Sequence, residues 1–351
     1  MKYHFLIIGH GLAGAILAVT LREQGHRVLV IDSFKPNAAS RVAAGLVNPL
    51  AGKRYAKSWN IDAFLPFAND FYKTLEKRFN VTLFHHKPIL KLFSSIEEQN
   101  TWMAKSAGGA LEAYVAETYL ELPPSEQINQ EMGGICIKGG GYVDLKKMLD
   151  LLAAELQQQN CFRNEPFRIE ELIVTEQEVR YKDVTARHVV FCEGYQAIHN
   201  PYFKWLPFSP NKGEVLDVSC DNFTAECIYN KAVYVVPLGD NQHRIGATYN
   251  WREVNEELTD TAREELTGKF QQIFKVPYRV TAHMAGIRPA VRDRKPLIGT
   301  HPHYQNISIF NGMGSKGVLM APYLAQNFAD ALAGKGEIIP EANINRYISL
   351  Y

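Results

Sequence analysis

Three glycines near the start of the chain, followed by one aspartate, have the spacing of a nucleotide-binding turn. Gly9, Gly11 and Gly14 form the pattern GxGxxG, and Asp32 follows 18 positions after the last of them. In such a pattern the first glycine permits a tight turn, the second lets a pyrophosphate approach the backbone, and the third lets a helix pack closely on a strand. An acidic residue at this distance can accept hydrogen bonds from a ribose. The spacing predicts a dinucleotide site, and Asp32 disfavours NADP because a carboxylate repels a 2′-phosphate.

The segments on either side of this turn have the patterns of the strand, helix and second strand that the motif requires. Residues 5–8 are a continuous apolar run, as expected of a parallel strand buried on both faces. A helix is predicted for residues 13–24, with Gly25 ending it and its positive N-terminus facing the phosphates. Residues 28–31 form the second strand. We also expect three neighbouring residues to contact the nucleotide: Leu12, Ala13 and Ser33.

The same stretch, residues 4–19, loosely fits a secretory signal peptide, because a lysine precedes an apolar run of suitable length. Two features oppose that interpretation. Glycine inside a helix costs roughly 1 kcal/mol relative to alanine, and this run contains three glycines. The pattern also continues past the place of a cleavage site, through the helix and into the second strand.

A second glycine turn lies near the C-terminus, and the two turns together favour FAD over NAD. A strand predicted for residues 307–310 precedes this turn, and an apolar-faced helix follows it from about residue 318 to residue 333. Residues 33–55 are irregular and rich in small residues, where a nicotinamide-binding domain would continue with regular strands and helices. One turn would hold the pyrophosphate, and the helix dipole and lysine of the other would stabilise a reduced flavin ring. The expected contacts of this second turn are Gly312, Gly314, Ser315, Lys316, Gly317 and Val318.

The composition describes a soluble globular chain of two domains. Its 351 residues exceed one simple core, and its net charge of +1 gives no electrostatic attraction to nucleic acid or membrane. No apolar run reaches the ~20 residues that cross a bilayer. The five cysteines are scattered without a CxxC pair, which is typical of reduced thiols in the cytoplasm, and no metal site is predicted.

Four segments of the sequence resemble the D-amino-acid oxidase family of FAD enzymes, which includes glycine oxidases and sarcosine oxidases. The most specific segment is AGIRPAVRDRKPLIG, residues 285–299, together with NGMGSKGVLMAP, residues 311–322. The others are IIGHGLAG with VLVID, SRVAAGLVNP, and VVFCEG. The resemblance is patchy but spans the whole chain in the family's order. It implies a Rossmann-type, glutathione-reductase-like FAD-binding domain of α/β class, with a second, mixed-sheet α+β substrate domain.

The resemblance also assigns cofactor contacts by matching position. It places the ADP half on the first glycine turn and Asp32, and it places adenine against the backbone of Phe167. The residues that would line the flavin or close over the cofactor are Ser40, Ala44, Gly45, Gly194 and the glycines of the second turn. Covalent sarcosine oxidases have a cysteine near the position of Gly286. This chain has none there, so the resemblance implies non-covalent FAD.

Three residues are candidates for the substrate side of the flavin. Arg288 matches the family's carboxylate-binding arginine; a guanidinium can form two parallel hydrogen bonds with a carboxylate and so fix the substrate carbon over flavin N5. Tyr234 matches a substrate-site tyrosine, and a tyrosine with a purely structural role in a strand is the competing interpretation. Arg244 matches a flavin-facing lysine of sarcosine oxidases, where a cation favours reaction with oxygen. Glycine oxidases have an apolar residue at that position.

The expected FAD-binding domain is discontinuous and covers residues 1–60, 140–205 and 290–351. The substrate domain covers residues 61–139 and 206–289, with the active site between the two domains. We expect oxidation of the C–N bond of a small amino acid or N-substituted amino acid, with hydride transfer to the flavin. Oxygen or another acceptor then reoxidises the flavin.

Three alternatives stay open at this point. The first is an FAD-dependent dehydrogenase of a 2-hydroxy acid. The second is removal of a carboxymethyl group from a modified wobble uridine of tRNA, which the basic segment of residues 48–59 suggests. The third is an FAD-binding protein without turnover.

Overall fold

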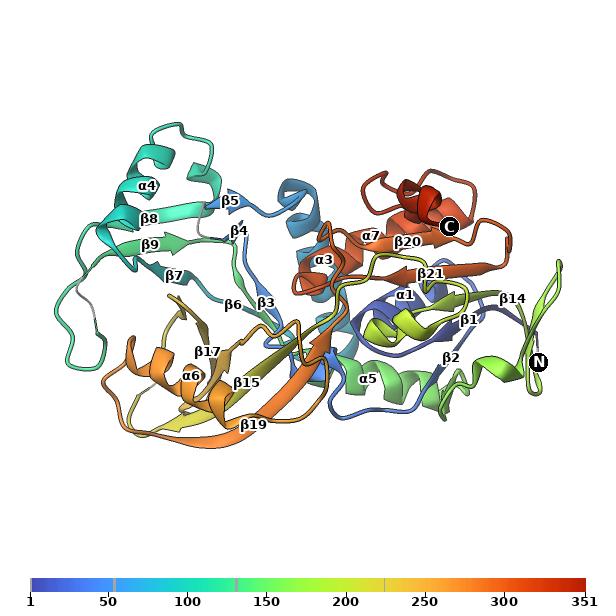
Figure 1. The fold of residues 1–351 in the computed structure, drawn as a ribbon, viewed down its shortest axis with the longest axis horizontal. Helices are drawn as coiled ribbons and strands as arrows, with labels where there is room; N and C mark the ends of the chain where they lie inside the picture. The colour runs from blue at the N-terminus through green and yellow to red at the C-terminus, as the bar shows by residue number, and fades with distance from the viewer. Residues whose placement is uncertain (1, 53–54, 130–131, 224) are drawn as a thin grey trace.

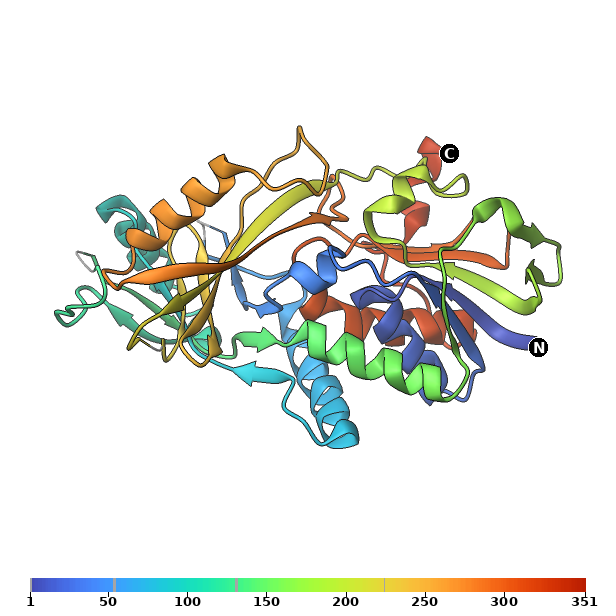
Figure 2. The same ribbon diagram turned by 90° about the horizontal axis from the view of Figure 1, so that it is seen from below.

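The computed structural model describes residues 2–52, 55–129, 132–223 and 225–351. Two eight-stranded sheets lie one beyond the other along the long axis of an elongated molecule (Figure 1). Helices cover the sheets, as the second view shows (Figure 2). Their bounds are α1 Leu12–Glu23, α2 Ala39–Val42, α3 Ile61–Phe79, α4 Ile96–Ser106, α5 Leu145–Gln158, α6 Asp260–Gln271 and α7 Gly317–Leu332. Shorter 3-10 turns are η1 Glu112–Tyr114, η2 Ile169–Glu171, η3 Gly194–His199 and η4 Ile344–Leu350.

The first sheet is mainly parallel and is built around its N-terminal strand. β1 pairs in parallel with β2 and β14, β2 pairs with β11, and β14 pairs with β21. Ile7 and Val30 are buried against helices α1, α5 and α7, while Leu6 and Leu29 lie in a second core on the opposite face. The strands are β1 Lys2–Ile8, β2 Val28–Asp32, β11 Phe162–Asn164, β12 Leu172–Val174, β13 Val179–Tyr181, β14 Val184–Phe191, β20 Leu297–Thr300 and β21 Ile307–Asn311.

The second sheet is mixed and has the order β19-β15-β18-β17-β16-β7-β9-β8. Its pairs are antiparallel except for β16 with β7. Helix α6 covers one face through Leu266 and Phe270. The strands are β7 Ile89–Leu92, β8 Val115–Tyr119, β9 Gly134–Ile137, β15 Asn211–Cys220, β16 Ile228–Asn230, β17 Tyr234–Gly239, β18 Gln242–Gly246 and β19 Tyr278–Arg288. Two small sheets join β3 Leu46–Val47, β10 Gly141–Val143 and β6 Phe84–His86, and β4 Leu50–Ala51 with β5 Ala56–Lys57.

The elements around both glycine turns agree with the sequence analysis to within a few residues. Helices α1 and α7 each begin one residue earlier and end one residue earlier than the sequence predicts. The α/β architecture with a second mixed sheet confirms the predicted fold class. Strands of each large sheet fall within the ranges expected for one domain, while the domain boundaries themselves stay a prediction. Among the helices within the described ranges, none is long and apolar enough to cross a membrane.

Helix α1 packs against β1 more closely than a side chain would permit. Gly9 has a φ of +104°, a conformation that L side chains rarely adopt. A Cβ on Gly14 would overlap the carbonyl oxygen of Gly9 and would come within 3.2 Å of the Cβ of Cys192. The two glycines therefore bring the start of α1 to the carboxyl ends of β1 and β14.

We predict that Gly14→Ala lowers the free energy of unfolding by about 1–3 kcal/mol, because the added methyl forces α1 away from β1. Gly268→Ala in α6 is the matched control, since a Cβ there meets nothing within 4 Å. That control should raise the stability by up to about 1 kcal/mol. Urea denaturation followed by circular dichroism measures both. Equal effects of the two substitutions would contradict the close approach of α1 to β1.

Candidate active site

One cavity of about 1230 Å³ lies between the two large sheets and is lined by residues from both. Its wall joins the two glycine turns to β15, β17 and β19 of the second sheet. Small-molecule sites usually occupy roughly 300–1,000 Å³. This cavity therefore has room for an extended cofactor with a small substrate beside it.

Nearly all the residues predicted to bind cofactor line this cavity. Gly14 and Gly312 do not, and both sit where the backbone is crowded: a Cβ on Gly312 would lie 2.9 Å from Leu297 N. The predicted residues in the wall are Gly9, Gly11, Leu12, Ala13, Asp32, Ser33, Ser40, Ala44, Gly45, Phe167, Gly194, Arg288, Gly314, Ser315, Lys316, Gly317 and Val318. Segments far apart in the sequence thus meet at one site.

The nucleotide end of the cavity has the groups that a ribose and a pyrophosphate require. The two carboxylate oxygens of Asp32 accept hydrogen bonds from the backbone N–H groups of His10 and Phe34, each at 2.6 Å. Each oxygen keeps a lone pair for a ribose hydroxyl. Ser40 Oγ accepts the N–H of Leu12 at 2.9 Å, so its own proton is free to be donated to a phosphate. The first turn of α1 holds no acidic residue, so its positive end is not compensated there.

A second helix N-terminus, that of α7, lies beside the first. A Cβ on Gly317 would come within 2.8 Å of Leu12 Cδ2, which shows how closely the two turns approach. The first turn of α7 also lacks an acidic residue. Lys316 Nζ donates to Ser58 Oγ at 2.9 Å, and burial, assisted by neighbouring positive charges, lowers the pKa of Lys316 to about 8. This end of the cavity can therefore stabilise negative charge on a bound ring.

Arg288 presents an unpaired edge of its guanidinium at the opposite end of the cavity wall. Nη1 donates to Asn211 Oδ1 at 2.8 Å, to the carbonyl of Lys212 at 3.4 Å and to the carbonyl of Thr248 at 3.3 Å. Within the described ranges, Nε and Nη2 donate to no protein acceptor. The guanidinium carbon lies 4.3 Å from the ring centroid of Tyr249. Because protein acceptors hold Nη1, Arg288 can bind a carboxylate through two parallel hydrogen bonds from Nε and Nη2.

Glycines on the second sheet make space for the two predicted substrate-side groups. A Cβ on Gly213 would overlap the guanidinium of Arg288, and one on Gly246 would overlap the hydroxyl of Tyr234. Tyr234 lines the cavity, and burial raises its pKa to about 12. Its hydroxyl therefore stays protonated at neutral pH and can donate a hydrogen bond toward a ligand.

Arg244 does not reach the cavity wall. Its Nε and Nη2 atoms bind the two carboxylate oxygens of Asp217 at 2.7 and 2.8 Å. Its Nη1 lies 3.4 Å from the carbonyls of Val42 and Ala43. The side chain thus ties the second sheet to the segment that carries Ser40. Asp217 compensates its charge, and its expected contact with flavin and oxygen stays a prediction.

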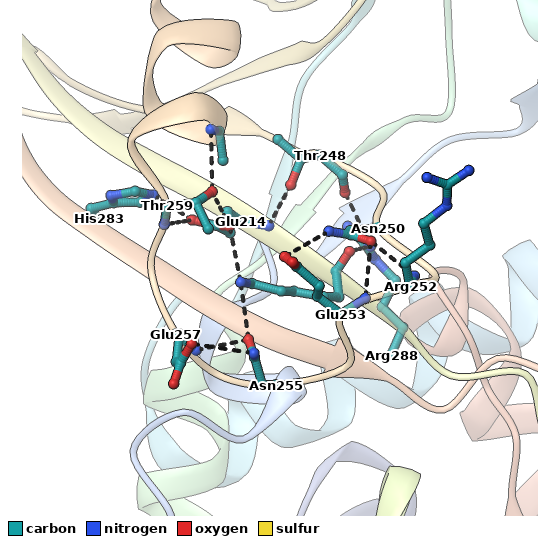
Figure 3. Close-up of polar contacts among 12 residues, drawn as sticks. Glu214, Thr248, Asn250, Arg252, Glu253, Asn255, Glu257, Thr259, His283 and Arg288 are labelled. Carbon is teal, nitrogen blue, oxygen red and sulfur yellow. Dashed lines mark hydrogen bonds and ion pairs between the residues drawn. The ribbon is translucent and has the colours of Figure 1, made fainter.

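A buried polar network behind β15 holds the loop that carries Tyr249 (Figure 3). Lys212 and Glu214 alternate with the cavity-facing residues of β15, and their charged atoms lie 3.3 Å apart at 1% and 3% exposure. Lys212 Nζ also contacts Asn255 Oδ1 at 3.2 Å. The carboxylate of Glu214 accepts both the backbone N–H and the hydroxyl of Thr259, at 3.0 and 2.9 Å. The middle and end of the loop are therefore fixed to the strand beside Arg288.

Sequence reasoning missed Tyr249 and this network. The available signal was the run KGEV near the start of β15, where two charged residues flank a glycine and are followed by apolar residues. Charged side chains on a strand buried on both faces need partners, so such a run indicates a paired internal network.

Glu193 is a half-buried residue in the cavity wall, between β14 and η3. Its Oε2 accepts a hydrogen bond from Asn200 Nδ2 at 2.7 Å. Burial raises the pKa of Glu193 from 4.5 to about 7, and the bond to Asn200 opposes that rise. The folded chain thus holds a proton on Glu193 between these pH values, whereas the unfolded chain has released it.

We predict that Glu193→Gln raises the melting temperature of the flavin-free protein by a few degrees at pH 8 and changes it little below pH 4.5. Wild-type stability falls as the pH rises from about 4.5 to about 7, because ionising a buried carboxyl group opposes folding. The amide cannot ionise and avoids this loss. Scanning calorimetry measures the effect, with exposed, cavity-lining Glu170 changed to glutamine as the control. A pH-independent difference would contradict the assignment.

Proteins similar to this chain include glycine oxidases and an iminodiacetate oxidase. The chain is 24% identical to glycine oxidase of Pseudomonas aeruginosa over 360 residues, covering 97% of this chain and 98% of that one. It is 25% identical to glycine oxidase of Bacillus subtilis over 365 residues, covering 95% of each chain. The crystal structure of iminodiacetate oxidase from Chelativorans sp. has a TM-score of 0.83 at 20% identity, covering 98% of both chains, and so shares the fold.

The sequence profile of a known family covers nearly the whole chain. The DAO profile, described as FAD dependent oxidoreductase, matches residues 4–331. This match confirms the resemblance drawn from the glycine turns and the Arg288 segment, and the uncompensated helix N-termini and glycine cradles fit the family's cofactor. The protein therefore belongs to the DAO family of FAD-dependent oxidoreductases, and its cofactor is FAD.

Proposed function

We propose that this oxidoreductase oxidises the C–N bond of a small amino acid or N-substituted amino acid. The observation that carries the proposal is the unpaired edge of Arg288 in the same cavity as both glycine turns. The similar proteins named glycine oxidase and iminodiacetate oxidase support this substrate class, since both names give an amine that carries a carboxylate.

The residues of the second sheet bind and orient the substrate. Nε and Nη2 of Arg288 take the two oxygens of its carboxylate, and Asn211 holds the guanidinium from the other side. Tyr249 covers one face of the guanidinium, which limits the directions from which a carboxylate can approach. Tyr234 offers a neutral hydroxyl beside it. Fixing the reacting carbon in this way supplies much of the catalysis that a hydride transfer needs.

The reaction removes a hydride from the substrate carbon and a proton from its nitrogen. When bound, FAD supplies the two-electron oxidant that receives the hydride. The amine must be neutral when the hydride leaves. The imine product reacts with water to give a carbonyl compound and ammonia or an amine. Oxygen or another acceptor closes the cycle.

The residues around the two turns would hold the cofactor. Asp32 and Ser40 supply an acceptor and a donor for the ADP half. Lys316 and the start of α7 supply positive charge for the ring. Phe167 lines the same wall as Asp32 and would contact adenine.

A 2-hydroxy acid is the second candidate substrate, because Arg288 would bind its carboxylate in the same way. The tRNA alternative has less support. Lys53 and Arg54, which carry part of the basic segment that suggested it, lie outside the described residues. Neither alternative requires a different cavity, so substrate tests decide between them.

We predict that Arg288→Ala weakens binding of a reducing amino acid by at least roughly 30-fold, because a desolvated carboxylate loses its charged partner. An anaerobic titration of the flavin with glycine, sarcosine, D- and L-amino acids and 2-hydroxy acids measures the bleaching of its visible absorption. Arg292→Ala, in the exposed part of the same hairpin, is the matched control and should behave as wild type. Unchanged titrations of Arg288→Ala would refute the carboxylate assignment. If hydroxy acids alone bleach the flavin, the second candidate replaces the first.

A further inference from the structure

Lys231 brings a positive charge to the cavity wall that no group of the described residues balances. It follows β16 and lines the same cavity as Arg288. Its backbone N–H closes a turn by donating to the carbonyl of Val233 at 3.0 Å. Across the described ranges, neither a hydrogen bond nor an ion pair engages its ammonium group. A half-buried lysine without a partner of this kind can bind an anionic group of a ligand.

The strand register places Asn230, the residue before Lys231, on the sheet face that carries Arg288. Asn230 pairs with Tyr234 of β17, Tyr234 pairs with Gly246 of β18, and Gly246 pairs with Val215 of β15. Residues directly opposite one another share a face, so this row lies on the side that lines the cavity. Asn230, Tyr234 and Val215 all contribute to the wall. Asn230 and Lys231 therefore both line a cavity wall that continues to the arginine.

The neighbouring lysine on the next strand is already compensated. Asn230 pairs in parallel register with Lys91 of β7. Lys91 Nζ lies 2.9 Å from Glu98 Oε1, and the hydroxyl of Tyr55 donates to the same oxygen at 3.0 Å. Lys91 and Glu98 thus form a neutral pair in which both side chains are nearly buried. Of these two lysines, only Lys231 therefore contributes an uncompensated positive charge to the cavity wall.

We propose that Lys231 and Asn230 form a second anion subsite, and that the substrate is an amino acid bearing a second acidic group. The first carboxylate binds Arg288 and the second binds the Lys231 ammonium. The inference rests on the proposed function, because that function defines which bond is oxidised. The binding of the two acidic groups can be tested without it.

The separation of the two cations sets the length of such a substrate. The Arg288 guanidinium lies over Gly213 of β15 and Asn230 lies on β16, with β18 and β17 between them. Three strand spacings amount to roughly 14 Å between the backbones. Glycine held by Arg288 would leave the Lys231 end uncovered. An amino acid with its second carboxylate several bonds from the first would reach both cations.

Unreactive acids test the subsite without any turnover. The probes are succinate, glutarate and adipate, each compared with the monocarboxylate of equal chain length: butyrate, valerate and hexanoate. Each acid is titrated into the FAD-loaded enzyme, and its dissociation constant comes from the change in the flavin spectrum. We expect the best dicarboxylate to bind about tenfold more tightly than its partner, as one charge-assisted contact provides.

Two substitutions and one control assign the preference to Lys231. Lys231→Met removes the charge and keeps the apolar stem, so it should abolish the tenfold preference and leave monocarboxylate binding unchanged. Lys231→Arg should keep the preference. Lys35→Met removes an exposed lysine from the cavity wall near Asp32 and should also keep it.

The outcomes separate this inference from the proposed function. Equal binding of the paired acids by the wild type, or a preference that survives in Lys231→Met, overturns the subsite. A preference lost only in Lys231→Met supports it, even if no amino acid reduces the flavin. In that last case the subsite stands and the proposed oxidation fails. Reduction by glycine or sarcosine with no preference for dicarboxylates keeps the oxidation and rejects the subsite.

Discussion

The close packing of helix α1 on strand β1 is the constraint on which the rest of the structure depends. Gly14 permits it because any larger residue would meet the carbonyl oxygen of Gly9. With α1 in this place, its uncompensated N-terminus lies beside the carboxyl ends of β1 and β14, near Asp32. The start of α7 then fits against Leu12. Two helix N-termini without acidic residues thus face one cavity, and this electrostatic arrangement suits an anionic dinucleotide.

Strand β15 of the second sheet carries groups with different roles on its two faces. On the cavity face of β15, Gly213 leaves space for the guanidinium of Arg288. On the opposite face, Lys212 and Glu214 form an ion pair at 3.3 Å. Burying two charges costs more than their attraction returns unless further hydrogen bonds complete the pair. Asn255 and Thr259 provide those bonds, and in doing so they fix the loop whose Tyr249 covers Arg288.

Local sequence patterns predicted those parts of the site whose geometry depends only on neighbouring residues. The two glycine turns, their helices and Asp32 could be placed because turn geometry and capping depend on neighbouring residues. Arg288 was found through a contiguous motif. The expected flavin contact of Arg244 stays a prediction, and its pairing with Asp217, which the register of β15 with β18 sets, could not be read from a local pattern.

The contribution of Lys231 could not be predicted from the sequence for the same reason. Strand register between distant segments decides which side chains share a face, and a shift of one residue would turn each side chain to the other face. Tyr249 reaches Arg288 only because a loop is fixed through a network that joins β15 to residues some forty positions later. No short pattern in the chain records these pairings.

The most direct measurement is a crystal structure of the FAD-loaded enzyme with an unreactive carboxylic acid. If one cavity holds the cofactor along the two glycine turns and a substrate carboxylate on the free edge of Arg288, the acid's two oxygens will lie on Nε and Nη2 of Arg288. The flavin ring will lie between that group and Lys316. An acid bound elsewhere, or a cofactor that itself occupies the free edge of Arg288, would contradict this arrangement.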